Sequence, residues 1–390
     1  MSLPAVLALF GLVLLVAIAV AHLRLKEAIA RPPAGPPSLA RYPSLSVVRP
    51  IRGLDVGARG NLRAALESDY PGEVETLFVL DDPADPSRPL VEEMVRAENR
   101  AGGRCQLLYA GAPPPGRTGK LNAMIVGAAR AQGELLAFGD SDTRPAPELL
   151  RLLVEALLAD PRIGDTFAPV VVNAKAETAG DVGYALLVNG WYGPSVARAA
   201  MPRGELPFIM GQLMVFRREA LAAAGGLECA DGQLVDDMYL GACVQRAGYR
   251  NVMIPHPLAV TTGGMALGAF LKLFRRWLLF SQSGLPGGFT GRNWLRGIAL
   301  GAALVVLIAA LRIDPRVALP AAIALALALY SPVALHRRFG GAPIPLHLLW
   351  VPIALPLGGP LLVLWSLARR RVDWRGRDYA LDLHARLRPT

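Results

Sequence analysis

Carboxylates in the sequence have the spacing of a metal- and nucleotide-binding site. Asp140-Ser141-Asp142 places two of them one residue apart, directly after the apolar run Leu135–Phe138. Magnesium and manganese are normally held by one or two carboxylates, and substrate phosphates supply further ligands. The motif therefore predicts a divalent metal (Mg²⁺ or Mn²⁺) at Asp142, with Asp140 towards the base or ribose. An ordinary turn or a helix cap is the structural alternative.

Two more acidic clusters accompany this motif. Asp81-Asp82 follows the apolar run Thr76–Leu80, and Asp236-Asp237 stands at the start of an apolar helix. A turn explains Asp85 nearby better than it explains Asp82, and helix capping requires only one aspartate of the second pair. A partly desolvated carboxylate is a suitable general base for an acceptor hydroxyl. We therefore expect all three clusters to belong to one site.

Basic and amide side chains suited to phosphate follow a glycine-rich loop. Lys120 and Asn122 come after Gly116-Arg117-Thr118-Gly119, where glycine allows close backbone approach and the cations offset phosphate charge. The loop is not a Walker A motif, because Leu121 follows the lysine. Arg276-Trp277 joins a guanidinium to a flat aromatic where the chain becomes apolar. Anchoring at a membrane interface is the alternative interpretation of that pair.

Alternating apolar runs and helical stretches would position these residues. This alternation predicts a mainly parallel, open α/β sheet, in which ligands bind beyond the carboxyl ends of the strands. A further strand is expected within Phe208–Phe216, and Gly183–Ala199 is either an interfacial element or a core helix. The expected strands are Leu45–Val48, Thr76–Leu80, Gln106–Ala110 and Leu135–Phe138, and the expected helices are Asn61–Glu67 and Lys120–Ala131.

Composition separates this chain from ordinary soluble enzymes. Of its 390 residues, 53% are hydrophobic, and the mean hydropathy is +0.36. The formal charge is +10, but the arginines flank apolar runs and no nucleic-acid motif is present. This pattern favours anionic lipid headgroups as partners over nucleic acid. The three cysteines have no metal-ligand spacing and indicate no disulfide framework.

The apolar residues gather into candidate membrane segments at both ends of the chain. Leu3–Ala21 is long enough to cross a hydrocarbon core about 30 Å thick. No basic region precedes it and cations follow it, which favours an anchor over a cleaved signal peptide and places the middle of the chain in the cytosol. The others are Ile298–Leu311, Val317–Leu335 and Ile344–Ala368.

The number of crossings stays open at this stage. The last segment contains Leu357-Gly358-Gly359-Pro360, and an arginine-rich tail follows that segment. The positive-inside rule places this tail in the cytosol, so we expect the last segment to be broken and re-entrant. The predicted organisation is an anchor (1–23), a linker (24–42), a cytosolic catalytic domain with interfacial elements (43–292), membrane segments (293–371) and a basic tail (372–390). A bacterial inner membrane suits the composition.

In order, these motifs resemble the membrane-bound family-2 glycosyltransferases with a GT-A (nucleotide-diphospho-sugar transferase) fold. The nearest resemblance is to ceramide glucosyltransferases and to bacterial relatives acting on hopanoid or glycerolipid acceptors. It spans nearly the whole chain. The motifs that carry it are Val48–Gly53, Asp69-Tyr70-Pro71, the Asp82 loop, Gly119–Asn122, Asp140–Asp142, Asp236-Asp237, Arg276-Trp277 and Trp374–Tyr379.

The resemblance implies a role for each matching residue. Asp237 is expected to be the general base, and Asp142 to hold the metal. Arg276 and Trp277 match the end of a Gln/Arg-x-x-Arg-Trp motif, and Leu273 at its first position is a departure from the family's pattern. The expected nucleotide-sugar ligands are Arg49, Pro50, Asp82, Lys120, Asn122, Asp140 and Asp236.

The implied activity is an inverting transfer of a sugar, glucose by resemblance, from a UDP-sugar to the hydroxyl of a membrane lipid. Ceramide, diacylglycerol and hopanoid all remain open as acceptors, as does the oligomeric state. A processive polysaccharide synthase of the same superfamily is one alternative, although it needs more membrane helices and a complete Gln-x-x-Arg-Trp motif. Transfer to polyprenyl phosphate and a non-catalytic membrane scaffold are the others.

Overall fold

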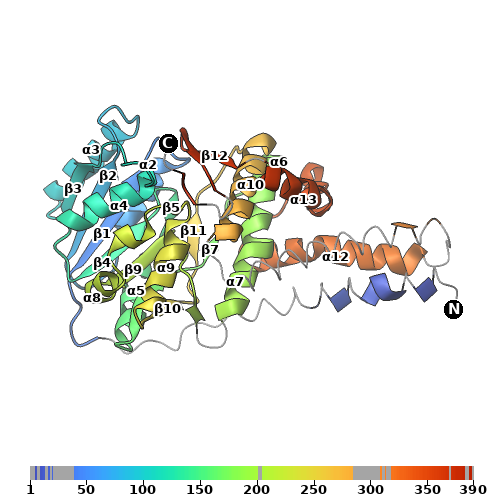
Figure 1. Ribbon diagram of the computed structural model, residues 1–390, viewed down its shortest axis with the longest axis horizontal. Coiled ribbons are helices and arrows are strands. Elements are labelled where there is room, and N and C mark those ends of the chain that lie inside the picture. The colour runs from blue at the N-terminus through green and yellow to red at the C-terminus, as the bar shows by residue number, and fades with distance from the viewer. Residues whose placement is uncertain are drawn as a thin grey trace.

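One mixed sheet forms the centre of the molecule. The computed structural model describes residues 39–200, 204–283, 318–368, 370–382 and 386–388, with short helical pieces within 5–20 and 308–312. The strand order is β3-β2-β1-β4-β9-β6-β10-β8 (Figure 1). The bounds are β1 Leu45–Ile51, β2 Val74–Leu80, β3 Arg104–Tyr109, β4 Leu135–Gly139, β6 Ile163–Phe167, β8 Glu205–Leu206, β9 Leu213–Arg217 and β10 Arg250–Met253. The predicted α/β sheet is confirmed.

The register of the parallel strands brings their carboxyl ends to one edge. Strands β1 to β4 pair in parallel, and Val48 of β1 lies opposite both Leu77 of β2 and Phe138 of β4. Strands β1, β2 and β4 are buried along nearly their whole length, as their near-continuous apolar sequences require, whereas β3 is partly exposed. The polar residues that follow β1, β2 and β4 therefore leave the sheet side by side.

Strand β9 is antiparallel to both of its neighbours, β4 and β6. It is shorter than the strand predicted within Phe208–Phe216, because residues 208–212 form a buried loop instead. This loop is tied to the end of β4, where the Asp140 amide donates to the Gln212 carbonyl at 2.9 Å. The loop thus brings Gly211 to the edge where the acidic motif begins.

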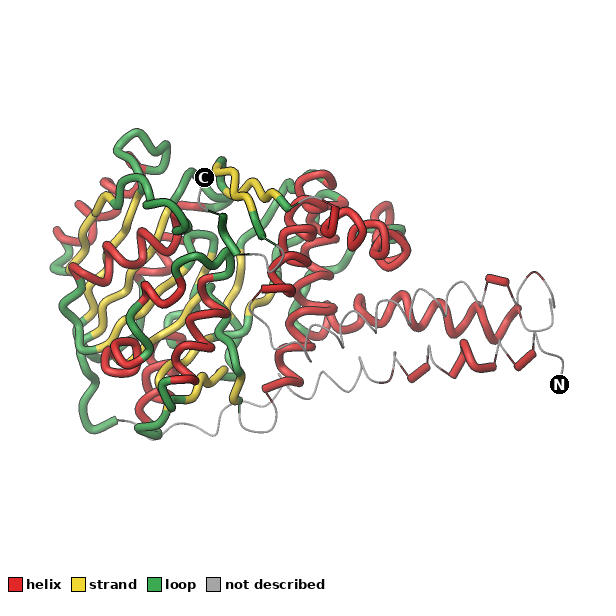
Figure 2. The backbone as a smooth tube through the Cα atoms, viewed as in Figure 1, coloured by secondary structure: helices red, strands yellow, loops and turns green. Residues whose placement is uncertain are grey.

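Helices cover the sheet (Figure 2). Two of these helices also begin at polar residues near this edge. The Thr118 hydroxyl accepts from the Leu121 amide and caps α4 at its start, so Lys120 lies in the first turn of this helix. Helix α9 begins at Asp236 itself. The bounds are α2 Ala58–Leu66, α3 Arg88–Arg100, α4 Gly119–Arg130, α5 Leu149–Leu158, α8 Arg218–Ala223 and α9 Asp236–Arg246, with a 3₁₀ turn at Leu227–Ala230.

Replacing Gly127 by alanine is expected to lower the free energy of unfolding by about 1–3 kcal/mol. Helix α4 packs so closely on the sheet that a Cβ at this position would meet the Val48 side chain at 2.3 Å. Gly268→Ala is the matched control, because a Cβ at Gly268 meets nothing within 4 Å. Denaturant titration of both variants measures the difference. Equal unfolding midpoints would contradict the tight contact between α4 and β1.

A second helical layer lies beside the sheet. Helix α6 (Ala179–Leu186) opens with a capping box between Thr178 and Asp181 and continues through a π-helical turn, η2 (Leu187–Tyr192), into α7 (Gly193–Ala200). Helices α10 (Leu267–Ser283), α12 (Ala318–Arg338) and α13 (Val351–Ala368) pack on α6 (Figure 1). Residues 180–190 are buried, which agrees with the core-helix interpretation of Gly183–Ala199 rather than the interfacial one.

Two small sheets complete the fold. Strands β5 (Thr143–Arg144), β7 (Val170–Val171) and β11 (Leu258–Val260) form the first. The second is the hairpin of β12 (Arg371–Trp374) and β13 (Arg377–Ala380). Its turn residues, Arg375 and Gly376, have φ values of 54° and 71°, as a tight two-residue hairpin turn requires.

The predicted membrane segments lie only partly within the described residues. About half of Leu3–Ala21 lies outside them, as do nearly all of Ile298–Leu311 and most of the linker 24–42. Helix α12 covers the segment predicted at Val317–Leu335 and projects away from the sheet (Figure 1). Within the described part of the chain, no helix combines the length and the apolarity that a bilayer crossing requires.

The break expected in the last apolar segment is absent. Helix α13 runs without interruption through Leu357-Gly358-Gly359-Pro360, so the prediction of a broken segment there is wrong. A 3₁₀ turn at Leu346–Leu348 precedes the helix instead. A proline in a helix costs one backbone hydrogen bond, and tertiary contacts can offset this cost. Here α10, α12 and α6 supply those contacts.

Candidate active site

A buried lysine lies at the centre of the acidic residues. The Lys120 ammonium is 2.6 Å from Asp140 Oδ1 and donates to the Gly211 carbonyl at 3.2 Å. Burial opposes the charged form, but the carboxylates of Asp140, Asp236 and Asp237 outweigh it and raise the pKa of Lys120 above its ordinary value. Lys120 is therefore a fixed cation among acidic groups.

The start of α9 presents a carboxylate suited to proton transfer. Asp237 Oδ2 accepts from the Gly211 amide at 2.7 Å, and Oδ1 accepts from the Met238 amide at 2.8 Å. Burial and the charge of Asp236 raise the pKa of Asp237 to about 6, although Lys120 opposes the shift. A carboxylate with a pKa near neutrality is ionised at pH 7 and still binds a proton readily, as a general base must.

The loop after β4 rests on a buried arginine. Arg49 donates to the backbone carbonyl of Asp140, and at 3.2 Å to that of Thr143. Burial lowers the pKa of this arginine to about 10, and the charges of Asp140, Asp142 and Asp55 oppose that effect. At this pKa the guanidinium keeps its charge near pH 7, so Arg49 fixes the loop electrostatically and by hydrogen bonding.

Asp142 has the properties of a single protein ligand for a divalent ion. Burial, together with the charges of Asp140 and Asp55, raises the pKa of Asp142 to about 6. A bound cation would relieve this excess of negative charge. The described residues contain no group of three or more His, Cys, Asp or Glu that could hold a metal. The donor set thus fits an ion that takes one carboxylate from the protein and its remaining ligands from phosphates and water.

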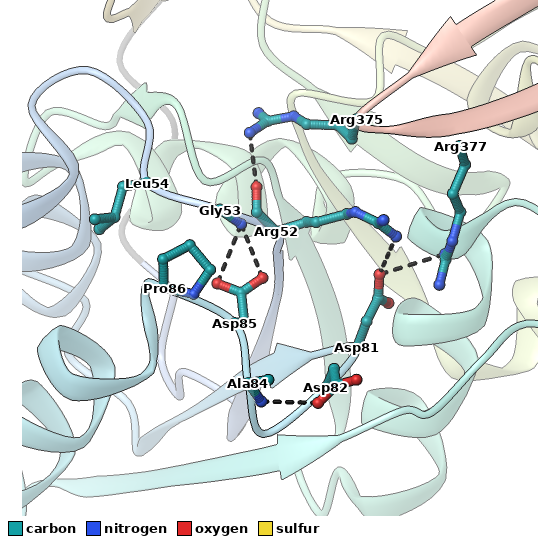
Figure 3. Close-up of a pocket in the computed structure, with 10 residues that line it drawn as sticks. All are labelled: Arg52, Gly53, Leu54, Asp81, Asp82, Ala84, Asp85, Pro86, Arg375 and Arg377. Carbon is teal, nitrogen blue, oxygen red and sulfur yellow. Dashed lines mark hydrogen bonds and ion pairs between the residues drawn. The ribbon is translucent and has the colours of Figure 1, made fainter.

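Beside these residues lies an open cavity of about 570 Å³ (Figure 3). Asp82 is exposed on its wall, and its Oδ1 accepts from the Ala84 amide at 2.7 Å. Asp85 shapes the wall by accepting from the Gly53 amide at 2.9 Å. The lining residues are Arg52, Gly53, Leu54, Asp81, Asp82, Ala84, Asp85, Pro86, Arg375 and Arg377.

Helix α10 joins the site to the second helical layer. Arg276 lies over the Trp374 ring at 5.2 Å, and Trp277 packs edge-on against Tyr192 at 5.0 Å and Tyr184 at 6.2 Å. Burial lowers the pKa of Arg276 to about 10. Leu273 packs on the hydrophobic core. It therefore adds no polar group to the site.

The structure brings together most of the predicted site residues. Lys120, Asp140, Asp236 and Asp237 form one cluster, and Asp142 follows in the same loop. The other predicted ligands lie around this cluster. Asp82 lines the cavity, Asn122 donates to the Ala110 carbonyl at 3.1 Å, and Pro50 lies near the end of β1 opposite Val79. The functional roles of all these residues stay predictions.

Several charged residues of the cavity region were not among the predicted ligands. Asp55 accepts from the Ser141 hydroxyl at 2.5 Å, and Asp81 pairs with Arg52 at 2.8 Å. Arg375 and Arg377 reach the cavity from the C-terminal hairpin. The motif Trp374–Tyr379 contains both arginines and could have indicated them. A motif in the C-terminal tail does not by itself show which part of the sheet it contacts.

A sheet of this order, with acidic loops at its carboxyl edge, defines the class of GT-A glycosyltransferases. A solved structure with this fold is the mannosyltransferase PcManGT from Pyrobaculum calidifontis in complex with GDP-Man and Mn²⁺. It superposes with a TM-score of 0.58 at 22% identity, covering 92% of this chain and 99% of that one. The chain belongs to glycosyl transferase family 21, whose model matches residues 9–387.

Curated relatives carry two kinds of name. The chain is 25% identical over 245 residues to an N-acetylglucosaminyltransferase from Sinorhizobium fredii, covering 60% of this chain and 56% of that protein. It is 20% identical over 246 residues to ceramide glucosyltransferase 3 from Caenorhabditis elegans, covering 63% and 52%. The chain thus spans about half the length of the curated relatives it matches. The resemblance to GT-A glycosyltransferases and ceramide glucosyltransferases is confirmed.

Proposed function

We propose that the protein transfers one sugar from a UDP-sugar to the hydroxyl of a membrane lipid, with inversion at the anomeric carbon. The observation that carries the proposal is the position of Asp237. This carboxylate has a pKa of about 6, is held by the Gly211 amide and adjoins the Lys120–Asp140 pair near the cavity. The lipid hydroxyl would attack the anomeric carbon as the bond to the diphosphate breaks, and Asp237 would accept the hydroxyl proton.

The remaining polar residues suit donor binding and charge stabilisation. The exposed Asp82 end of the cavity would take the uracil, and Arg49 would hold the Asp140–Asp142 loop against the donor. Lys120 and Arg276 are buried cations that would offset charge on the departing UDP, where a preorganised field is most effective. A divalent ion held by Asp142 would add Lewis-acid stabilisation of the same diphosphate.

Membrane attachment and a lipid acceptor are parts of this proposal. The apolar segments of the sequence support attachment, with the catalytic domain in the cytosol at a bacterial inner membrane. Helix α13 adds support, because a row of its leucines is exposed (Leu357 51%, Leu361 70% and Leu364 62%). An exposed apolar row on a helix suits contact with lipid. The ceramide glucosyltransferase relatives support a lipid hydroxyl as acceptor.

A second donor is favoured by the other relatives. Their names as N-acetylglucosaminyltransferases make UDP-N-acetylglucosamine a candidate beside UDP-glucose. Both sugars share the nucleoside diphosphate, so the carboxylates and cations described above serve either one.

Incubation of the full-length protein in lipid nanodiscs with each donor tests the proposal. Ceramide, diacylglycerol, a hopanoid and polyprenyl phosphate are offered separately with Mg²⁺ or Mn²⁺, and products are identified by mass spectrometry. We expect one glycolipid that carries one added sugar. A ladder of longer products would support a processive synthase, and product formation only on polyprenyl phosphate would support that alternative. If none of these lipids gives metal-dependent release of UDP, the proposed transfer is contradicted.

The transfer rate is expected to fall on acidification through pH 6. Both Asp237 and Asp142 must be ionised, and burial raises both pKa values to about 6, so each carboxylate is lost as the pH falls below that value. Two such groups make the acid limb of log(kcat/KM) steeper than a single ionisation. Rates measured between pH 5 and 8 check this. A flat profile down to pH 5 would remove Asp237 from its assigned role.

A further inference from the structure

The C-terminal hairpin forms one wall of the cavity. At its turn, Arg375 Nη1 lies 2.6 Å from Asp55 Oδ1 and donates to the Arg52 carbonyl at 2.9 Å. Arg377 Nη1 lies 3.3 Å from Asp81 Oδ2. Figure 3 shows both side chains entering from the hairpin, Arg375 above Arg52 and Arg377 beside Asp81. Two cations from the end of the chain thus face a space bounded by the first two strands.

Contacts along the hairpin hold this turn in position. The Gly119 amide donates to the Tyr379 hydroxyl at 3.3 Å, which fastens β13 to the start of α4. Arg275 donates to the Arg371 carbonyl at 2.6 Å, and Arg276 lies over Trp374. The hairpin therefore contacts the end of the glycine-rich loop before Lys120, and it contacts helix α10, which carries Arg276-Trp277.

The charges on this side of the cavity are incompletely balanced. Asp81 Oδ2 is shared between Arg52 at 2.8 Å and Arg377 at 3.3 Å. Arg377 Nη1 is buried and makes no hydrogen bond within the described residues, because its contact with Asp81 is an ion pair only. A Cβ on Gly119 would lie 2.0 Å from the same nitrogen, so the guanidinium also meets the positive end of α4. Asp82 and Asp85 are directed to the amides of Ala84 and Gly53.

We propose that Arg375 and Arg377 bind the diphosphate of the nucleotide donor. Guanidinium groups bind phosphate oxygens through paired N–H donors, and Arg377 has donors to spare. Arg375 is also close enough to Asp140 and Asp142 for their charges to act on it. A diphosphate at the hairpin turn would therefore lie between the cavity and the metal ligand. Asp55 and Asp81 hold the two arginines when no anion is bound, and they release them to the phosphates. The identity of the diphosphate as a sugar donor rests on the proposed function.

Binding of inorganic pyrophosphate to the full-length protein in nanodiscs tests this proposal without any sugar. Isothermal titration with Mg²⁺ present is expected to show at least about tenfold weaker binding for Arg375→Gln and for Arg377→Gln, because each loses a charge-assisted contact. Arg371→Gln is the matched control. Its side chain lies on the same hairpin but is 78% exposed, and pyrophosphate should bind to this variant as to the unmodified protein. Asp55→Asn should bind pyrophosphate severalfold more tightly, since a competing carboxylate is gone.

Unchanged pyrophosphate affinity in both arginine variants overturns the proposal. Equal weakening in Arg371→Gln also overturns it, because the effect would then belong to hairpin charge in general. The Asp55→Asn variant tests the proposal even if the arginine variants unfold. If this variant binds pyrophosphate as the unmodified protein does, or more weakly, Asp55 does not compete with pyrophosphate for Arg375. Sugar transfer measured on the same samples separates the two proposals. If pyrophosphate binding depends on the hairpin arginines but no sugar is transferred, only the transferase proposal is contradicted. If sugar is transferred but pyrophosphate binding does not depend on these arginines, only the proposal for Arg375 and Arg377 is contradicted.

Discussion

Asp237→Asn is expected to lower kcat by about 10²–10⁴-fold while the affinity for the nucleotide-sugar changes little. The asparagine keeps an oxygen that can accept from the Gly211 amide, so the start of α9 should hold its position. What the variant loses is a group that can take the proton of the acceptor hydroxyl. Single-turnover rates and donor titration, measured on the same preparation, distinguish the loss of chemistry from a loss of binding.

The same substitution is expected to raise the free energy of unfolding at pH 7. Burial and Asp236 raise the pKa of Asp237, so keeping this side chain ionised costs stability above pH 6. A neutral amide avoids that cost. Glu67→Gln removes an equal charge from an exposed pair with Arg63 and should leave both rate and stability unchanged. Normal turnover by Asp237→Asn would require a different general base.

Lys120→Met is expected to cost about 3–5 kcal/mol of stability and to reduce transfer to a small residual rate. The methionine fills a similar volume, but it leaves Asp140, Asp236 and Asp237 buried without the cation that compensates them. The pKa of Asp237 should then rise further, which moves the acid limb of any residual activity to higher pH. Chemical denaturation and a pH–rate profile measure the two effects.

A double-mutant cycle shows whether the Lys120–Asp140 pair causes this loss. Asp140→Asn in the Lys120→Met background removes one of the uncompensated charges, so it should restore part of the stability. It should not restore transfer, because Lys120 is then still missing from the site. Strictly additive losses of stability would mean that the ion pair at 2.6 Å contributes no coupling.

The sequence was sufficient for the elements whose pattern is local. Strands β1, β2 and β4 are near-continuous apolar runs, and their polar successors marked the carboxyl edge correctly. Strand β9 inserts in antiparallel orientation between β4 and β6, and no local pattern specifies which neighbours a strand will have. The helical course of α13 through its prolines was also inaccessible, because the helices packed around it determine that course.

The site was predictable in its parts but not in its assembly. Lys120, Asp140 and Asp237 each stood out by residue type and by the run before them. Their mutual contact depends on the Gly211 loop, which the sequence pattern assigned to a strand. The hairpin wall was the hardest part, since Arg375 contacts the Arg52 carbonyl across 323 positions of chain. Contacts between segments so far apart produce no periodic pattern in the sequence from which they could be predicted.

The C-terminal hairpin has a consequence for the order in which the cavity is assembled during synthesis. Beyond it, the Leu387 amide donates to the Gly232 carbonyl at 2.9 Å, just before the Asp236-Asp237 pair. On the ribosome, every carboxylate of the site emerges before residues 371–387 do. A nascent chain therefore has Asp237 and Asp142 before it has the hairpin wall of the cavity, so this wall forms only after both carboxylates have been made.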